Sequence, residues 1–305
     1  MGKTDERERP DLLAPEQLAL LGGMEFIAEK VVEGFLAGLH RSPHRGFSVE
    51  FAEHRAYQPG DDLRHIDWRM FGRSDRYYIK QYEEETNLRA YLFLDMSASM
   101  AWSSRPGELP AKEWYAKQLA MSLALLLLRQ GDSVGLIGFD TSVRSQVSPR
   151  GGRRHWYDLM RAAASLVPSG QTDAASALQE VVGRLNRRGL IILFSDLLVE
   201  PEATKLALRF LKHRGHEVLV FHIVDPGERE LPGMRDARFV DPETGQELPV
   251  SVADLRQEYR EAVERAIAEW RSFFTPLGID YLVLQSDQPM AYALRAYLRK
   301  RERLG

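Results

Sequence analysis

The uninterrupted apolar run Leu190 to Phe194 constrains the fold of this chain more than any other stretch. A strand with one face in water alternates apolar and polar residues, whereas a parallel strand covered by helices on both faces is apolar throughout. Further strands, each largely apolar, are predicted at residues 89–95, 133–139, 218–224 and 279–284, and segments with helical spacing lie between them. This alternation predicts an α/β fold: a doubly wound, mostly parallel sheet of the Rossmann-like class with right-handed crossovers.

The connecting segments complete this prediction. Helices are expected at residues 111–129, 156–166, 174–185, 202–213, 253–274 and 289–301. Residues 141–147 alternate between apolar and polar and are expected to form a short antiparallel edge strand. A tight-turn signal, Asp241 to Gly245, separates two short extended runs, so we expect an inserted hairpin near residues 236–250.

The chain ahead of the first predicted buried strand has a different character. Residues 1–11 carry charges of both signs and are expected to form a disordered tail. Apolar residues at helical spacing predict two helices over residues 15–39, and two alternating runs further along predict strands. We therefore expect a small N-terminal helical and antiparallel β extension over residues 12–87, followed by the main domain over residues 88–305.

Composition narrows the classes of partner. The chain has 305 residues and a formal net charge of -3, so no global positive field favours nucleic acid or a membrane surface. It contains no cysteine, which excludes disulfides, thiolate metal sites and a cysteine nucleophile. The N-terminus lacks an apolar signal core, and the most apolar segment, Leu119 to Leu128, is too short to span a bilayer. We expect a cytoplasmic protein with no membrane span and no nucleic-acid partner.

Polar side chains follow two of the predicted buried strands. Asp95, Ser97 and Ser99 occupy alternate positions after one strand, Asp196 follows another, and Thr172 precedes a predicted helix. Ligands of open α/β sheets bind outside the carboxyl ends of the strands, so we expect these five residues to converge from three loops. Carboxylate and hydroxyl oxygens suit Mg²⁺, Mn²⁺ or Ca²⁺, and two carboxylates leave a coordination position open for a partner's carboxylate.

The five residues, in this order and on these elements, resemble the metal-ion-dependent adhesion site (MIDAS) of von Willebrand factor A domains. The resemblance covers Leu88 to Arg301. It implies that the five side chains coordinate a divalent metal directly or through water. It also implies that an acidic side chain of a protein partner supplies a missing ligand.

A second resemblance lies ahead of this domain. The segment Tyr57 to Trp68, with Pro59-Gly60-Asp61-Asp62 at its centre, is similar to the signature of the bacterial family called domain of unknown function 58. Members of that family are typically encoded beside MoxR-type AAA+ ATPases. The resemblance implies a non-enzymatic adaptor or co-chaperone that binds such an ATPase or its client.

Two other functions compete with a metal-dependent binding module. Asp95 at a strand end also resembles the nucleophile position of a metal-dependent phosphohydrolase, but Ser97 stands where haloacid-dehalogenase phosphatases have their general acid. The sequence contains no Gly-rich phosphate loop and no Gly-x-Ser-x-Gly elbow. The third possibility is a structural scaffold in which the metal site is vacant.

Overall fold

The computed structural model describes residues 13–20, 22–40, 54–56, 71–72, 77–80, 88–169, 177, 180–181, 183, 185, 187–231, 236–240 and 247–302. Among the helices that these residues form, none combines the length and the apolar character that a membrane span requires.

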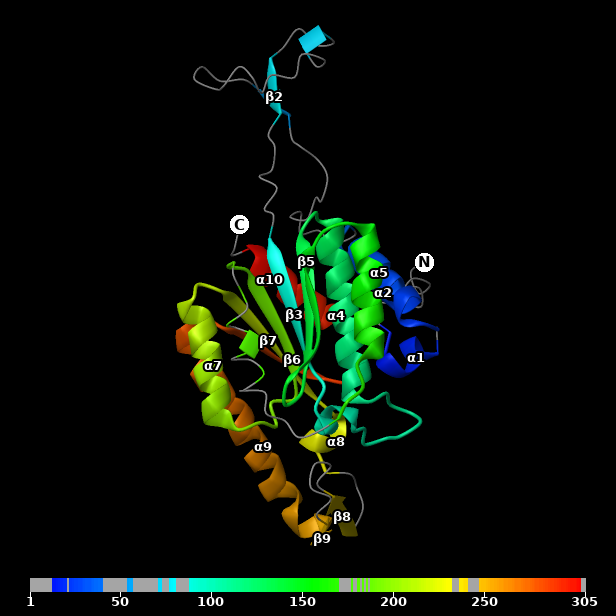
Figure 1. Ribbon diagram of the computed structural model, residues 1–305. Helices are drawn as coiled ribbons and strands as arrows, with labels where there is room; N and C mark the ends of the chain where they lie inside the picture. The colour runs from blue at the N-terminus through cyan, green and yellow to red at the C-terminus, as the bar shows by residue number, and fades with distance from the viewer. Residues whose placement is uncertain are drawn as a thin grey trace.

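Six strands form the main sheet, in the spatial order β5-β4-β3-β6-β7-β10 (Figure 1). Their bounds are Arg89–Asp95 for β3, Ser133–Phe139 for β4, Val143–Arg150 for β5, Leu190–Ser195 for β6, Glu217–Val224 for β7 and Asp280–Gln285 for β10. All neighbouring pairs are parallel except β4 and β5, which confirms the predicted mostly parallel sheet with an antiparallel edge. Counted along the chain, this is the doubly wound order 3-2-1-4-5-6, which reverses direction between β3 and β6.

Helices cover both faces of this sheet (Figure 1). Among the described residues, the α-helices with defined bounds are α1 (Pro15–Ala19), α2 (Met24–His40), α4 (Lys112–Arg129), α5 (Arg153–Ser165), α7 (Pro201–His213), α8 (Pro226–Arg229), α9 (Val252–Phe274) and α10 (Ala291–Glu302), with 3-10 turns η3 (Ala98–Ala101) and η4 (Thr275–Leu277). Residues 177, 180, 181 and 183, in the predicted helix 174–185, are also helical.

The alternation of side chains in β3 explains why both faces are apolar. Leu92 and Leu94 belong to the core built with α2, α4, α5 and α10, whereas Tyr91 and Phe93 belong to the core built with α7 and α9. Every residue of β6 is buried, as its apolar run predicts. Burial on two faces holds the ends of β3 and β6 in fixed positions.

Two small antiparallel pairs lie outside the main sheet. β1 (His54–Ala56) pairs with β2 (Tyr78–Lys80), and β8 (Asp236–Val240) pairs with β9 (Glu247–Ser251). Of the two alternating runs ahead of the main domain that predict strands, the first, residues 47–51, lies outside the described residues. The domain boundaries at residues 11 and 87 stay predictions.

Candidate metal centre

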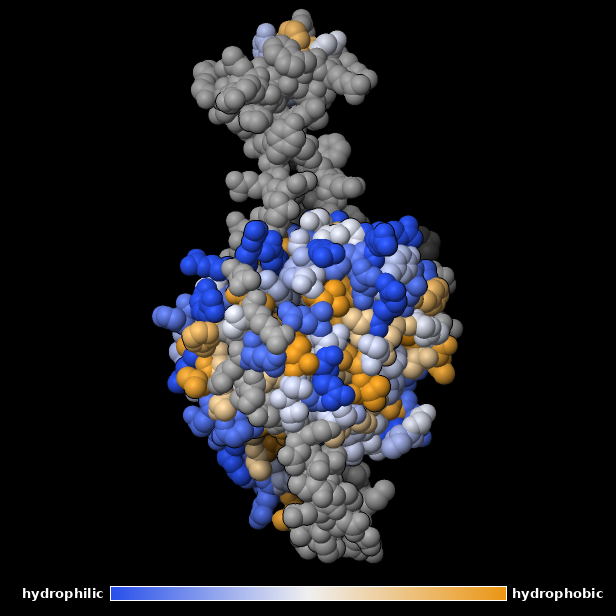
Figure 2. Space-filling view, in the orientation of Figure 1, coloured by the Kyte–Doolittle hydropathy of each residue, from blue (hydrophilic) through white to orange (hydrophobic). Residues whose placement is uncertain are grey.

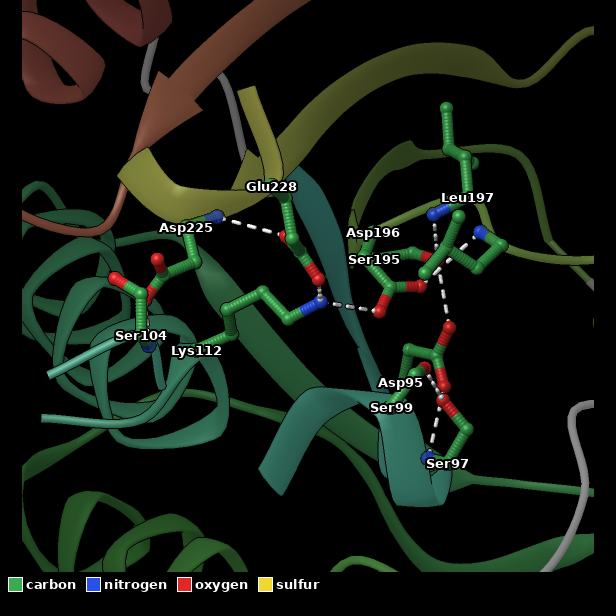
Figure 3. A network of polar contacts seen from close by, with 11 residues as sticks. Asp95, Ser97, Ser99, Ser104, Lys112, Ser195, Asp196, Leu197, Asp225 and Glu228 are labelled. Carbon is green, nitrogen blue, oxygen red and sulfur yellow. Dashed lines mark hydrogen bonds and ion pairs between the residues drawn. The ribbon is translucent and has the colours of Figure 1, made fainter. Parts of the chain in front are cut away.

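The carboxyl end of β3 carries the first part of the candidate site (Figure 3). Asp95 is the last residue of the strand, and its Oδ1 accepts a hydrogen bond of 3.0 Å from the Ser97 backbone N–H. The η3 turn begins directly after Ser97, and it brings the Ser99 Oγ to 3.0 Å from the Ser97 Oγ. These three side chains are almost fully buried, so their oxygens occupy defined positions.

The second part comes from the end of β6, the strand beside β3. Leu94 pairs with Phe194, so Ser195 and Asp196, the next residues along the chain, lie next to Asp95. The Ser195 hydroxyl donates to Asp95 Oδ2 at 2.6 Å. A carboxylate and a hydroxyl 100 positions apart in the chain therefore meet at the point where the strand order reverses.

The backbone after Asp196 takes an uncommon conformation. Leu197 has a φ of 53°, which lies in the left-handed region that bulky residues other than glycine rarely adopt. Two hydrogen bonds hold it: the Leu197 N–H donates to Ser195 Oγ at 3.0 Å, and the Leu198 N–H donates to Asp196 Oδ1 at 3.1 Å. Strain of this kind is found preferentially at functional sites.

A lysine that the sequence analysis did not select completes the polar network (Figure 3). Lys112 begins α4, is fully buried, and places its Nζ 2.8 Å from Asp196 Oδ2. The same ammonium contacts Glu228 of α8, whose other carboxylate oxygen accepts from the Asp225 N–H at 2.8 Å. The ammonium thus bridges two carboxylates.

The two aspartates differ in electrostatics. Burial, followed by the charge of Asp196, raises the pKa of Asp95 to about 6. Burial also acts to raise the pKa of Asp196, but the charge and hydrogen bond of Lys112 outweigh burial and lower it. For Lys112 itself, burial is outweighed by the charges of Asp196 and Glu228, so its pKa is raised and it stays protonated. Asp196 thus has a counter-charge, whereas no lysine, arginine or histidine of the described residues pairs with Asp95.

Four of the five predicted ligands come together in this structure: Asp95, Ser97, Ser99 and Asp196. Thr172 lies outside the described residues. The segment that precedes it does reach the site, because the Ser169 N–H donates to the Met96 carbonyl at 2.9 Å.

The donor set fits a small divalent cation in two respects. Ligand oxygens about 2.1 Å from an octahedral Mg²⁺ lie about 3.0 Å apart when they are adjacent, which is the separation of the two serine hydroxyls. That distance also suits a hydrogen bond between them. The buried Asp95 carboxylate supplies a negative charge that a cation would neutralise. The described part of the chain holds no cluster of three or more His, Cys, Asp or Glu side chains, so hydroxyls would have to contribute to coordination.

Lys112 and Glu228 were missed because their roles depend on contacts between distant elements. One weak indication exists in the sequence for Lys112. A basic residue at the first position of a helix lies beside the positive end of the helix dipole, which is unfavourable. Asp225 and Glu228 form a capping-box pattern, which predicts a helix start but not a lysine partner.

The family of the chain follows from comparison with known sequences. The family model described as "Protein of unknown function DUF58" matches residues 53–269, more than half of the chain. The chain belongs to this family. That membership confirms the family resemblance of the Tyr57 to Trp68 segment, and the family description assigns no activity.

Proteins with similar sequences occur in mycobacteria. "Uncharacterized protein Rv1480" of Mycobacterium tuberculosis is 29% identical over 300 residues, which cover 97% of this chain and 93% of that protein. "Uncharacterized protein Mb1516" of Mycobacterium bovis has the same identity and coverage. The similarity therefore extends through both the N-terminal extension and the main domain.

Two solved structures also resemble this chain. The conserved hypothetical protein BatB from Bacteroides thetaiotaomicron is 18% identical with a TM-score of 0.47, and the match covers 71% of this chain and 99% of that one. A von Willebrand factor type A structure from Catenulispora acidiphila is 16% identical with a TM-score of 0.36, over 46% of this chain and 34% of that one. The fold of this DUF58 chain is assigned from its own strand order.

Proposed function

We propose that this DUF58 protein is a non-enzymatic, divalent-metal-dependent module that binds another protein. The observation that carries the proposal is the buried Asp95 carboxylate, which lies beside two serine hydroxyls and lacks a cationic partner among the described residues. Mg²⁺ at such a site, or Mn²⁺ or Ca²⁺, would be held by Asp95, Ser97 and Ser99, with Thr172 and Asp196 as further oxygen donors. The metal would supply a positive charge with an open coordination position.

The hydrogen bonds around the hydroxyls support binding rather than catalysis. Ser97 and Ser99 lie against each other, and Ser195 donates to a carboxylate, so none of the three has a histidine base in the described structure. The buried His222 instead shares a 2.6 Å hydrogen bond with the Tyr281 hydroxyl. A serine nucleophile is commonly activated by a histidine base, and the described contacts give none of these hydroxyls such a partner.

The partner is proposed from the chemistry of the site and from the family resemblance. A metal that retains positive charge in a site with few carboxylates favours an acidic side chain from a second protein. A cytoplasmic MoxR-type AAA+ ATPase, or a client of that ATPase, is the proposed source of this side chain, with the DUF58 chain as its adaptor or co-chaperone.

The test is co-purification of the full chain with the MoxR-type ATPase of the same genome, in Mg²⁺ and in EDTA. Asp95→Ala should lose retention of the ATPase as completely as EDTA does. Asp158→Ala, which removes an exposed carboxylate on α5, is the matched control and should bind as the wild type does. Retention of the ATPase that neither EDTA nor Asp95→Ala reduces would refute the proposal.

One observation favours a second candidate, a scaffold whose metal site is vacant. The Lys112 ammonium already pairs with Asp196, so part of the negative charge is balanced without a metal. A thermal-unfolding series with Mn²⁺ separates the two candidates. A ligand that binds only the folded state raises the unfolding temperature, and a vacant scaffold would show no such rise.

A further inference from the structure

We propose that Lys112 is a positioning residue that fixes Asp196 and sets the net charge that the site presents to a metal and to a partner. The proposal rests on the metal-binding function proposed above and names the residue that tunes it. Its basis is a fully buried ammonium held between two carboxylates, one that follows β6 and one in α8.

Both carboxylate oxygens of Asp196 already accept hydrogen bonds within the protein. Its Oδ2 accepts from Lys112 at 2.8 Å and its Oδ1 accepts from the Leu198 N–H at 3.1 Å. Both partners are buried, with side-chain exposures of 0% for Lys112 and 1% for Asp196, so water does not screen the pair. The Asp196 carboxylate is therefore oriented and neutralised before any metal arrives.

Glu228 links the site to the other elements at this edge of the sheet. Glu228 contacts the Lys112 ammonium and belongs to α8, where Asp225 caps the helix by accepting from the Gly227 N–H at 2.7 Å. The other Asp225 oxygen accepts from the Ser104 N–H at 3.0 Å. The Tyr259 hydroxyl of α9 donates to the Glu228 carbonyl at 2.9 Å. Lys112 thus joins the end of β6 to α8, and Tyr259 joins α8 to α9.

Lys112 also affects the binding of a cation. With Asp196 paired to Lys112, Asp95 is the carboxylate left to neutralise a divalent ion, so the loaded site keeps positive charge. The nearby ammonium also repels the ion. Lys112 therefore weakens metal binding and leaves charge for the carboxylate of a partner, which a site with two free aspartates would not do.

The experiment is a calorimetric titration of the full chain with Mn²⁺ for the wild type, Lys112→Met and a matched control, Lys300→Met. Lys300 is also a buried lysine between two carboxylates, 2.6 Å from Glu217 and 3.0 Å from Asp280, and it lies at the opposite ends of the strands. Both variants should unfold at lower temperature without metal. Only Lys112→Met should bind Mn²⁺ more tightly, by roughly tenfold or more.

A double variant covers the case in which Lys112→Met does not fold. Lys112→Met with Glu228→Gln removes the ammonium together with one of its two carboxylates, so fewer buried charges stay unpaired. Asp196 is still released toward the metal, and the double variant should also bind Mn²⁺ more tightly than the wild type.

The outcomes separate this inference from the proposed function. If the wild type binds Mn²⁺ and Lys112→Met binds it within twofold or more weakly, the role of Lys112 is refuted while metal binding stands. If Lys112→Met binds Mn²⁺ and the wild type does not, the role of Lys112 is supported and the metal-dependent function is refuted. Absence of binding in both refutes both.

Discussion

At the scale of single residues, Asp95 is a buried carboxylate without a cationic partner among the described residues. Its carboxylate is fully buried, receives hydrogen bonds from Ser97 and Ser195, and has Asp196 as a neighbouring negative charge. Burial of a charge without an ionic partner destabilises a fold. Residues that carry such a cost are commonly kept for function.

The residue-scale prediction concerns Asp95→Asn in the absence of metal. Asparagine keeps the shape, accepts from the Ser97 N–H, and removes the buried charge. The free energy of unfolding in EDTA should rise by on the order of 1–2 kcal/mol. Urea denaturation measures this change.

Asp158→Asn is the control for Asp95→Asn, because it removes a carboxylate that is exposed on α5. Its stability should stay within about 0.5 kcal/mol of the wild type. An Asp95→Asn protein that is less stable than the wild type in EDTA would contradict the electrostatic account of Asp95.

The residue scale also shows how far the sequence predicts the site. Asp95, Ser97, Ser99 and Asp196 were predicted because all four lie at or shortly after the carboxyl end of a buried strand, and neighbouring parallel strands bring such positions together. Lys112 was not, since its partner Asp196 lies 84 positions away and the pairing depends on where α4 begins. Thr172 as a ligand stays a prediction.

At the scale of elements, the first and last residues of the buried strands were predicted to within one residue. A strand that is buried on both faces has a largely apolar sequence, which marks its limits. The prediction of the edge strand was less accurate, because a strand was expected at residues 141–147 and β5 spans Val143–Arg150. Pro149 suggests that the strand ends before it, because proline has no backbone N–H to donate. An edge strand tolerates proline, since one of its two sides pairs with no neighbouring strand. α8 was missed because four residues carry no periodicity.

The contact between β3 and β6 gives a packing prediction at Gly189, directly before β6. A Cβ on Gly189 would lie 2.2 Å from the Arg89 carbonyl oxygen, so Gly189→Ala must push the two strands apart. We expect a loss of about 1–3 kcal/mol in the free energy of unfolding. Gly151→Ala is the control, since its Cβ would meet only the Asp132 carbonyl at 3.7 Å. Equal stability of the two variants would contradict the close approach.

The turn between α7 and β7 gives a prediction of pH dependence. Burial lowers the pKa of His216 below its ordinary value of 6.5, and the charges of Arg214 and Arg188 act in the same direction. A histidine with a lowered pKa contributes stability above the unfolded pKa, and that stability is lost as the pH falls toward the folded pKa. The free energy of unfolding should therefore fall below about pH 6.5.

His216→Gln tests the assignment of this pH dependence, because glutamine stays polar and does not take up a proton. Urea denaturation between about pH 7.5 and pH 5 should show a shallower decline for His216→Gln than for the wild type. Parallel curves for the two proteins would show that His216 does not contribute.

At the scale of the whole molecule, the strand order places the candidate site. The order 3-2-1-4-5-6 reverses between β3 and β6, and the four predicted ligands that the structure describes lie at or just after the ends of these two strands. The surface in the view of Figure 2 mixes hydrophilic and hydrophobic residues without a continuous apolar face. The site chemistry, rather than a large apolar patch on this face, is therefore the basis of the proposed partner recognition.

Crystals of the full chain grown with Mn²⁺ test the central claim most directly, by anomalous scattering. The account predicts an anomalous peak within about 2.5 Å of the Ser97 and Ser99 hydroxyls, with an Asp95 oxygen as a ligand or one water away. The same peak should be absent from Asp95→Ala crystals grown under identical conditions. Wild-type crystals without a peak at these residues, at saturating Mn²⁺, would contradict the account.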